Sequence, residues 1–127
     1  MSIESELFTL LKDIAAIKAG SISRVYPRVT PDNATFPLII YQVVGGQAYD
    51  YLERKLPDCE HYRVQISCWS KDADTTRALA LAVREKVVED GTAFAAAETL
   101  GQAVDDYEDA QKIYGSRQDF GVWLKVR

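Results

Sequence analysis

Residues 59–69 read CEHYRVQISCW and alternate between two kinds of side chain. One set is apolar and comprises Tyr62, Val64, Ile66 and Cys68; the other comprises His61, Arg63, Gln65, Ser67 and Trp69. Successive side chains of a strand point to opposite faces of a sheet, so the alternation predicts a strand with the first set on the core. We therefore expect a fold organised around a sheet with one buried face.

Further strands are predicted on both sides of this segment. Near the C-terminus two sets alternate, Phe120, Val122, Leu124 and Val126 with Gly121, Trp123, Lys125 and Arg127. This pattern indicates a second strand with one core face. Residues 38–44 (LIIYQVV) are apolar at both parities, which favours a strand covered on both faces. A short extended piece at 22–26 and a strand at 103–109 are also expected. Residues 92–103 are ambiguous between a short helix and a strand, and of the two interpretations we favour a short helical or irregular piece.

Two segments have the apolar spacing of amphipathic helices. In residues 3–19, after an N-cap at Ser2 and before Gly20, the apolar positions are Leu7, Leu10, Leu11, Ile14 and Ile17. In 74–89, after a cap at Asp72 or Asp74 and before Gly91, they are Ala78, Leu79, Ala82, Val83 and Val87. The apolar sides of both helices must be buried, and the apolar face of the sheet is the surface available to both. We therefore expect an α+β fold, an antiparallel-dominated sheet with two main helices on one face, in a single domain spanning 1–127.

The reverse face of this sheet is the first candidate interaction surface. If both helices cover one face, Trp69 and Trp123 lie on the other, with part of Tyr41 or Val43. Aromatic residues concentrate in interface cores, so an uncovered face that bears two tryptophans predicts contact with another chain. The alternative is that the loop 21–37 or the segment 92–103 folds over that face.

Residues 45–58 (GGQAYDYLERKLPD) are the second candidate interaction surface. They separate two predicted strands, and Pro57 forbids an ordinary central strand, so we expect the extended tip of a long hairpin. Few apolar residues hold this tip to the domain, which predicts mobility in an isolated subunit. Tyr49, Tyr51 and Leu52 would then serve as anchors for a partner.

Composition excludes several function classes. The chain has 127 residues and a net charge of −4 without a basic run, which argues against sequence-specific binding of nucleic acid or an anionic membrane surface. It contains no apolar stretch of about 18 residues, and acidic residues stand where a signal peptide needs basic ones. We therefore expect no membrane partner and folding in the cytoplasm.

The chemically reactive residues do not form a recognisable catalytic or metal motif. On one strand, Cys59 and His61 project to one face and Cys68 to the other, so the three cannot converge on one ion. The single histidine has no evident orienting partner for nucleophilic catalysis. Four carboxylates at 105–109 are interpreted as a solvated strand end. We therefore predict no catalytic residue, no cofactor, no metal and no enzymatic activity.

A longer stretch carries a family resemblance. Residues 25–41 (VYPRVTPDNATFPLIIY) resemble the signature segment of the tail completion, or tail terminator, proteins of tailed bacteriophages, which leads into the first long strand. The other features follow in the same order: an N-terminal amphipathic helix, an aromatic hairpin tip, YRVQISCW, TRALALAVREKV, an acidic segment and YGSRQDFGVWLKV. The resemblance covers nearly the whole chain.

The resemblance implies a small α+β protein without catalytic activity that assembles as a ring, commonly a hexamer, at the head-proximal end of the tail tube. Such a ring stops tube growth and joins tail to head. Its implied partners are further copies of itself, the tail tube protein and the head connector protein. Its implied location is the bacterial cytoplasm during assembly and the tail or neck of the finished virion. Two alternatives stay open at this point: a head-side connector or neck component, and a small-molecule-binding or enzymatic α+β domain.

Overall fold

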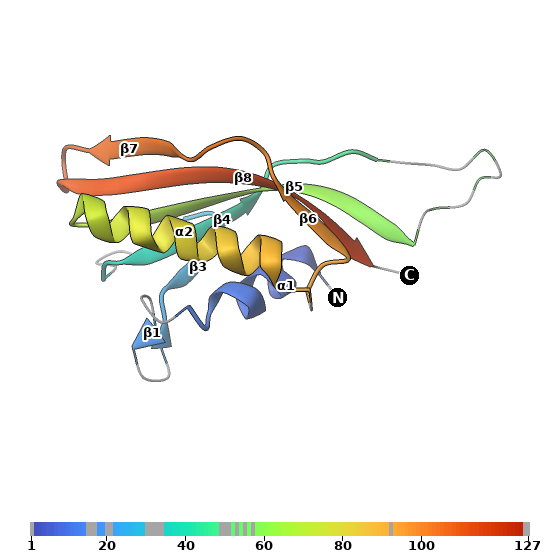
Figure 1. Ribbon diagram of the computed structural model, residues 1–127, viewed down its shortest axis with the longest axis horizontal. Coiled ribbons are helices and arrows are strands. Elements are labelled where there is room, and N and C mark those ends of the chain that lie inside the picture. Colours follow the sequence, from blue (N-terminus) through green and yellow to red (C-terminus); the bar gives the residue numbers. More distant parts are fainter. Residues whose placement is uncertain are drawn as a thin grey trace.

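A computed structural model describes residues 2–14, 18–19, 22–29, 35–48, 52, 54, 56, 58–91 and 93–125. Two helices and eight strands follow one another in it (Figure 1): α1 (Ile3–Leu11), β1 (Lys18–Ala19), β2 (Ile22–Ser23), β3 (Val25–Pro27), β4 (Leu38–Val43), β5 (Cys59–Ser70), α2 (Ala73–Glu89), β6 (Ala96–Thr99), β7 (Val104–Glu108) and β8 (Ile113–Lys125). Among the described residues, no helix is long and apolar enough to cross a membrane.

Six of the strands form one sheet, in the order β3-β4-β5-β8-β6, with β7 also paired to β8. β5 and β8 pair along twelve positions, from Cys59 opposite Lys125 to Ser70 opposite Tyr114, and form the centre of the sheet. Only the short pairing of β3 with β4 is parallel in this sheet. The expected antiparallel-dominated sheet is confirmed.

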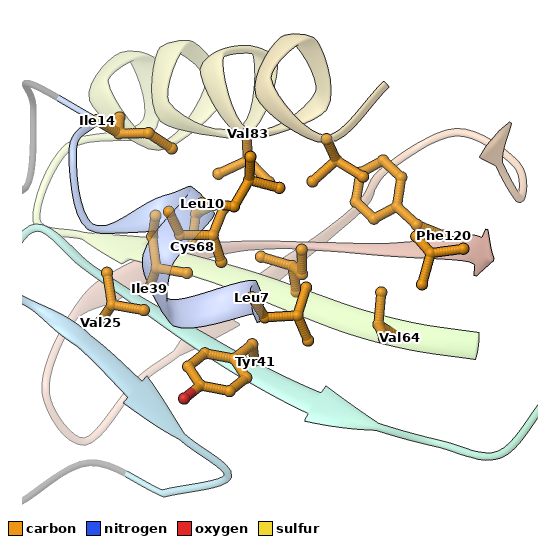
Figure 2. Close-up of a cluster of buried hydrophobic side chains, with 14 of the residues drawn as sticks. Leu7, Leu10, Ile14, Val25, Ile39, Tyr41, Val64, Cys68, Val83 and Phe120 are labelled. Atoms are coloured by element: carbon orange, nitrogen blue, oxygen red, sulfur yellow. The ribbon is translucent and has the colours of Figure 1, made fainter. Parts of the chain in front are cut away.

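Both helices cover the same face of this sheet (Figure 1). Figure 2 shows Leu7 and Leu10 of α1 and Val83 of α2 packed with Val64 and Phe120 of the central strands. Four of these five side chains are completely buried, and Leu10 nearly so. This confirms the α+β class with two helices on one face, which we call the covered face.

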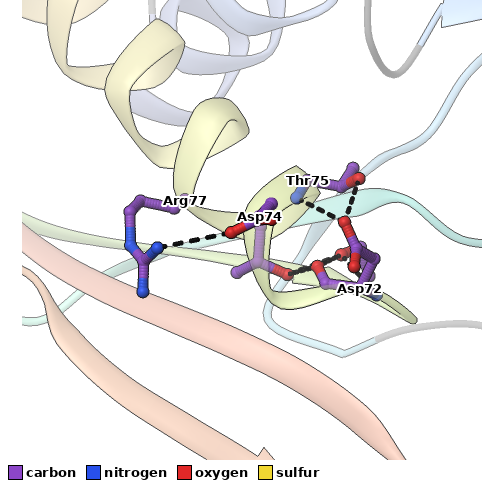
Figure 3. A network of polar contacts seen from close by, with 6 residues as sticks. Asp72, Asp74, Thr75 and Arg77 are labelled. Carbon is purple, nitrogen blue, oxygen red and sulfur yellow. Dashed lines mark hydrogen bonds and ion pairs between the residues drawn. The ribbon is translucent and has the colours of Figure 1, made fainter.

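Helix α2 begins where the sequence predicts it. The carboxylate of Asp72 accepts hydrogen bonds from the backbone N–H and the hydroxyl of Thr75, both at 3.0 Å, and Asp74 lies 3.5 Å from Arg77 (Figure 3). Two buried polar side chains also attach the helix to the sheet. The hydroxyl of Thr76 donates to the carbonyl of Tyr114 at 2.9 Å, and the amide of Gln118 donates to the carbonyl of Ala80 at 2.9 Å.

One predicted position on α2 is wrong. Ala78 is exposed, and the buried residues of the helix are Thr76, Leu79, Ala80, Val83 and Val87. These residues follow the three- and four-residue spacing of a single helix face, and Ala78 lies beyond the edge of that face. Thr76 is buried on this face instead of Ala78, because its hydroxyl forms hydrogen bonds with the carbonyl of Tyr114 and the hydroxyl of Ser70 in the sheet.

The first helix is shorter than predicted. It is capped by the hydroxyl of Ser2 as expected, but it ends at Leu11 instead of continuing to residue 19. Lys18 and Ala19 belong to β1, which pairs with β2. Ile14 is buried although it follows the helix, so its apolar spacing reflects burial and not helical structure. Ile17 and Gly20 lie outside the described residues.

The segment 92–103 is also corrected. Residues 96–99 form β6 and pair with β8, from Ala96 opposite Trp123 to Thr99 opposite Phe120. Alanine favours a helix locally, but the free edge of β8 offers a ladder of backbone partners that outweighs this propensity. The other strand predictions hold within one or two residues at β4, β5 and β7, while Val126 lies outside the described residues.

Candidate subunit interface

The sheet face opposite the helices, which we call the open face, carries Trp69 and Trp123, as the sequence predicts. In the central ladder Trp69 of β5 lies opposite Gly115, and Trp123 of β8 lies opposite His61. Both pairs have the opposite parity to the buried Val64 and Val122, so they point away from the helices. Residues 96–99 of the segment 92–103 join the edge of the sheet instead of folding over this face.

Tyr41 and Val43 do not belong to the open face, contrary to expectation. Tyr41 is only 4% exposed and packs with Ile39 in the core under the helices (Figure 2). Burial raises the pKa of its phenol above the ordinary value, with a smaller contribution from the Glu4 carboxylate. The ladder explains the assignment: Tyr41 pairs with Ile66 and Val43 with Val64, and both partners face the core.

The middle of the open face is polar. Arg63 donates to Asp119 at 2.7 Å across the central ladder. Farther along, Arg117 lies 3.9 Å from Asp106 of β7. The tryptophans stand at the two ends of this polar strip. Trp69 and His61, the partner of Trp123, are eight residues apart on β5, or about 26 Å at roughly 3.3 Å per residue.

The Trp123 end is built against the stem of the predicted hairpin. The rings of His61 and Trp123 lie 4.9 Å apart between centroids, tilted by 58°. The backbone N–H of Gln47 donates to Nδ1 of His61 at 3.1 Å. Gly121 lies beneath the imidazole, where an added Cβ would come within 2.9 Å of Nε2. A hollow of about 520 Å³ lies at this end of the face. Its lining residues are Gly46, Gln47, His61, Arg63, Glu98, Leu100 and Trp123.

The hairpin stem continues along β5 past the end of β4. The N–H of Val44 donates to the carbonyl of Arg63, and the N–H of Arg63 donates to the carbonyl of Gly45, both at 2.8 Å. Beyond the stem, Leu52 is 106% exposed and Leu56 is 51% exposed. Tyr49 and Tyr51, the other two predicted anchors, lie outside the described residues.

The Trp69 end holds an apolar groove that the sequence analysis did not identify. Its volume is about 200 Å³, and its lining residues are Phe36, Leu38, Ile40, Trp69, Glu108, Gln111 and Ile113. We call it the Trp69 groove. Leu38 and Ile113 are buried here although they face away from the helices. The signal was available in the sequence: residues 38–44 are apolar at both parities, and Leu38 and Ile40 belong to the set not needed by the core.

Gly115 fixes the position of the tryptophan in this groove. A Cβ added at Gly115 would meet three ring carbons of Trp69 at 2.6–2.7 Å, so the indole lies directly on the glycine backbone. No larger residue would fit there without displacing the ring. The groove therefore depends on a glycine of β8 as much as on the apolar residues of β4.

The reactive side chains lie where the strand parity predicts. Cys68 is fully buried in the core, and burial raises the pKa of its thiol to about 12. Cys59 and His61 are partly exposed and belong to the opposite parity. The carboxylates at 105–109 lie on β7 and in the turn that follows it, and Asp105 and Asp109 are exposed. The described residues contain no group of three histidine, cysteine or carboxylate side chains placed to hold a metal ion.

One family model matches almost the whole chain. The family model of tail completion protein gp17 matches residues 5–125. Among solved structures, a chain described as "Virion of native gene transfer agent (GTA) particle" superposes with a TM-score of 0.69. The two chains are 16% identical, and the match covers 98% of this chain and 96% of the other, which shows a shared fold. No curated protein sequence matches.

Proposed function

The chain belongs to the tail completion protein gp17 family and is a structural tail completion protein; from this premise we propose that it forms a ring at the head-proximal end of the tail tube. There the ring stops tube growth and presents the surface to which the filled head attaches. The proposed contacts are with further copies of the chain, with the tail tube protein and with the head connector protein. A hexamer is the proposed ring, and the proposed role involves no catalytic step.

The observation that carries this proposal is the family match over 121 of the 127 residues, from 5 to 125. The match includes every strand of the sheet, all of α2 and α1 from Ser5 onwards, and therefore all of the surfaces described above. The similar fold of a chain from a gene transfer agent virion supports the same role, because that chain also comes from a phage-like particle.

The shape of the subunit supports assembly by unlike surfaces. The hairpin stem and the Trp69 groove lie at opposite ends of the open face, because His61 and Trp69 stand at opposite ends of the pairing between β5 and β8. Contacts between different patches of identical subunits are heterologous, and they generate rings when the rotation between neighbours closes. The polar middle of the open face suits the rim of such a contact, where ion pairs such as Arg63 with Asp119 stay hydrated.

The proposed subunit contacts are made by five residues: Trp69, Trp123, Leu52, Tyr49 and Tyr51. The support differs between them: Trp69 and Trp123 border the two hollows of the open face, and Leu52 is fully exposed. Tyr49 and Tyr51 are proposed on the composition of the hairpin alone.

Deletion of the gene from the phage or prophage that encodes it tests this function. Electron microscopy of the lysate is expected to show filled heads beside unjoined, overlong tails, with normal particles restored by a plasmid copy. Unjoined tails of normal length would contradict tube stopping and favour a neck component on the head side. Normal infectious particles from the deletion would overturn the assignment.

A further inference from the structure

The Trp69 groove is too small for an ordinary ligand and has the character of an anchor site. Its volume of about 200 Å³ lies below the roughly 300–1,000 Å³ of small-molecule sites. Its floor is apolar, whereas Glu108 and Gln111 form a polar margin. A hollow of this kind fits one or two aliphatic side chains with a positive charge beside them.

This chain itself displays such a segment. Residues 52–56 read LERKL, and they place Glu53 and the basic pair Arg54 and Lys55 between two leucines, so that basic residues outnumber acidic ones. Leu52 and Leu56 are both exposed, and Arg54 is exposed between them. Residues 104–111, which include the margin of the groove, carry four carboxylates and no basic residue. The two segments are therefore complementary in charge as well as in apolar character.

A hairpin cannot fill the groove of its own chain. Gln47 is held at His61, and the five residues from Gln47 to Leu52 span at most about 18 Å when fully extended. The groove begins at Trp69, about 26 Å away along β5. The chain after β4 also runs away from the turn between β7 and β8 (Figure 1). Any hairpin that occupies the groove must come from another copy.

We propose that the Trp69 groove of one copy receives Leu52 of a second copy, with the second copy's Arg54 beside Glu108. This inference rests on the proposed self-association and states how neighbours in the ring are joined. The contact is heterologous: each copy gives its hairpin to one neighbour and its groove to the other. The hairpin tip, which the domain does not need for its own core, is then an element of the assembly.

Cysteine crosslinking in assembled particles tests the contact. The test chain carries Leu52→Cys and Gln111→Cys in a Cys59→Ser background. Cys68 stays, because its thiol is buried and the pKa of about 12 keeps it protonated. Mild oxidation of purified particles is expected to give a ladder of disulfide-linked multimers that collapses on reduction, because every copy offers both partners.

The matched control pairs Leu52→Cys with Leu81→Cys, a 57% exposed position on α2 on the covered side of the sheet. The control is expected to give no ladder. A ladder from the control as strong as that from the test pair, or no ladder from the test pair in particles that assemble normally, would overturn the docking proposal and leave the ring function standing.

A charge exchange gives an independent readout. Glu108→Arg alone and Arg54→Glu alone are each expected to lower the infectious titre about tenfold or more, since like charges then face each other at the contact. The double variant is expected to recover most of the titre, whereas Glu85→Arg on the outer side of α2 should leave it unchanged. Failure of the double variant to exceed both single variants would overturn the docking. A normal titre from the gene deletion would instead overturn the function itself.

Discussion

The covered and open faces of the sheet are built by the same strands but filled in opposite ways. On the covered face β5 presents Val64, Ile66 and Cys68, all completely buried. On the open face the same strand presents Arg63, Gln65 and Ser67 between two aromatic ends. The covered face thus accounts for most of the buried apolar surface, and apolar burial is the main favourable term in folding. The open face contributes less to folding. Its apolar side chains are confined to its two ends, at Trp69 and at Trp123.

This difference separates stability from assembly. A substitution on the covered face should unfold the subunit, whereas one at either end of the open face should leave a folded subunit that fails to assemble. The polar strip between the ends, which includes the Arg63–Asp119 pair, keeps the open face hydrated before assembly.

Phe120→Ala should have the largest effect on folding. The ring is completely buried on the covered face, so its removal is expected to lower the free energy of unfolding by about 3–5 kcal/mol. Trp123→Ala, three residues along the same strand on the open face, should lower it by clearly less and yet abolish the joining of heads to tails. Urea denaturation and complementation measure the two effects. Equal losses of stability from the two variants would remove the distinction between the faces.

Gly115→Ala should damage the Trp69 groove selectively. The added methyl group would meet the indole at 2.6–2.7 Å, so the ring must move, at an expected cost of about 1–3 kcal/mol. Joining activity should fall as well, because the groove loses its shape. Gly91→Ala is the matched control, since nothing lies within 4 Å of a Cβ there. Thermal unfolding of both variants checks the prediction, and an unperturbed Gly115→Ala protein would contradict the packing described here.

Thr76→Val tests the polar attachment of α2 to the sheet. The substitution keeps the shape but removes the hydroxyl that donates to the carbonyl of Tyr114 and contacts the hydroxyl of Ser70. We expect a loss of about 1–2 kcal/mol in the free energy of unfolding, with joining retained. Thr9→Val, at an exposed position of α1, is the control and should change stability little. A neutral Thr76→Val would mean that the hydroxyl contributes nothing to holding the helix.

The two cysteines should differ in reactivity with little effect on stability at neutral pH. The pKa of the Cys68 thiol is raised from 9.0 to about 12 by burial, so the folded state favours the neutral form. Its contribution to stability is complete below pH 9 and is lost as the pH rises towards 12. At pH 8, iodoacetamide should label Cys59 first and reach Cys68 only after urea unfolding, as read by mass spectrometry. Equal labelling of the folded protein would contradict the burial of Cys68.

Much of the fold follows from alternation in the sequence. The parity of 59–69 correctly separates Val64, Ile66 and Cys68 from Arg63 and Trp69, because a sheet with one buried face enforces period two. The errors occur where burial and local structure differ. Ile14 continues the helical spacing of apolar residues although α1 has already ended. Ala96 and Ala97 form part of a strand because their backbone groups pair with the edge of β8.

Less of the candidate interface follows from the sequence. The positions of Trp69 and Trp123 are predictable from parity, but their separation by a polar strip is a property of the register between β5 and β8. The strand 38–43 is apolar at both parities, so its sequence does not say which set faces the helices. In the structure Ile39, Tyr41 and Val43 face the helices. Leu38 and Ile40 therefore face the other side, where they line the groove with Glu108, Gln111 and Ile113.

Cryo-electron microscopy of the assembled particle at its neck would show directly how the subunits are joined. We expect a closed ring of this chain at the head-proximal end of the tail tube, with the open face in the contacts between neighbours and Leu52 of each copy in the Trp69 groove of the next. Subunits joined through α1 and α2, with the open face exposed to solvent, would contradict it.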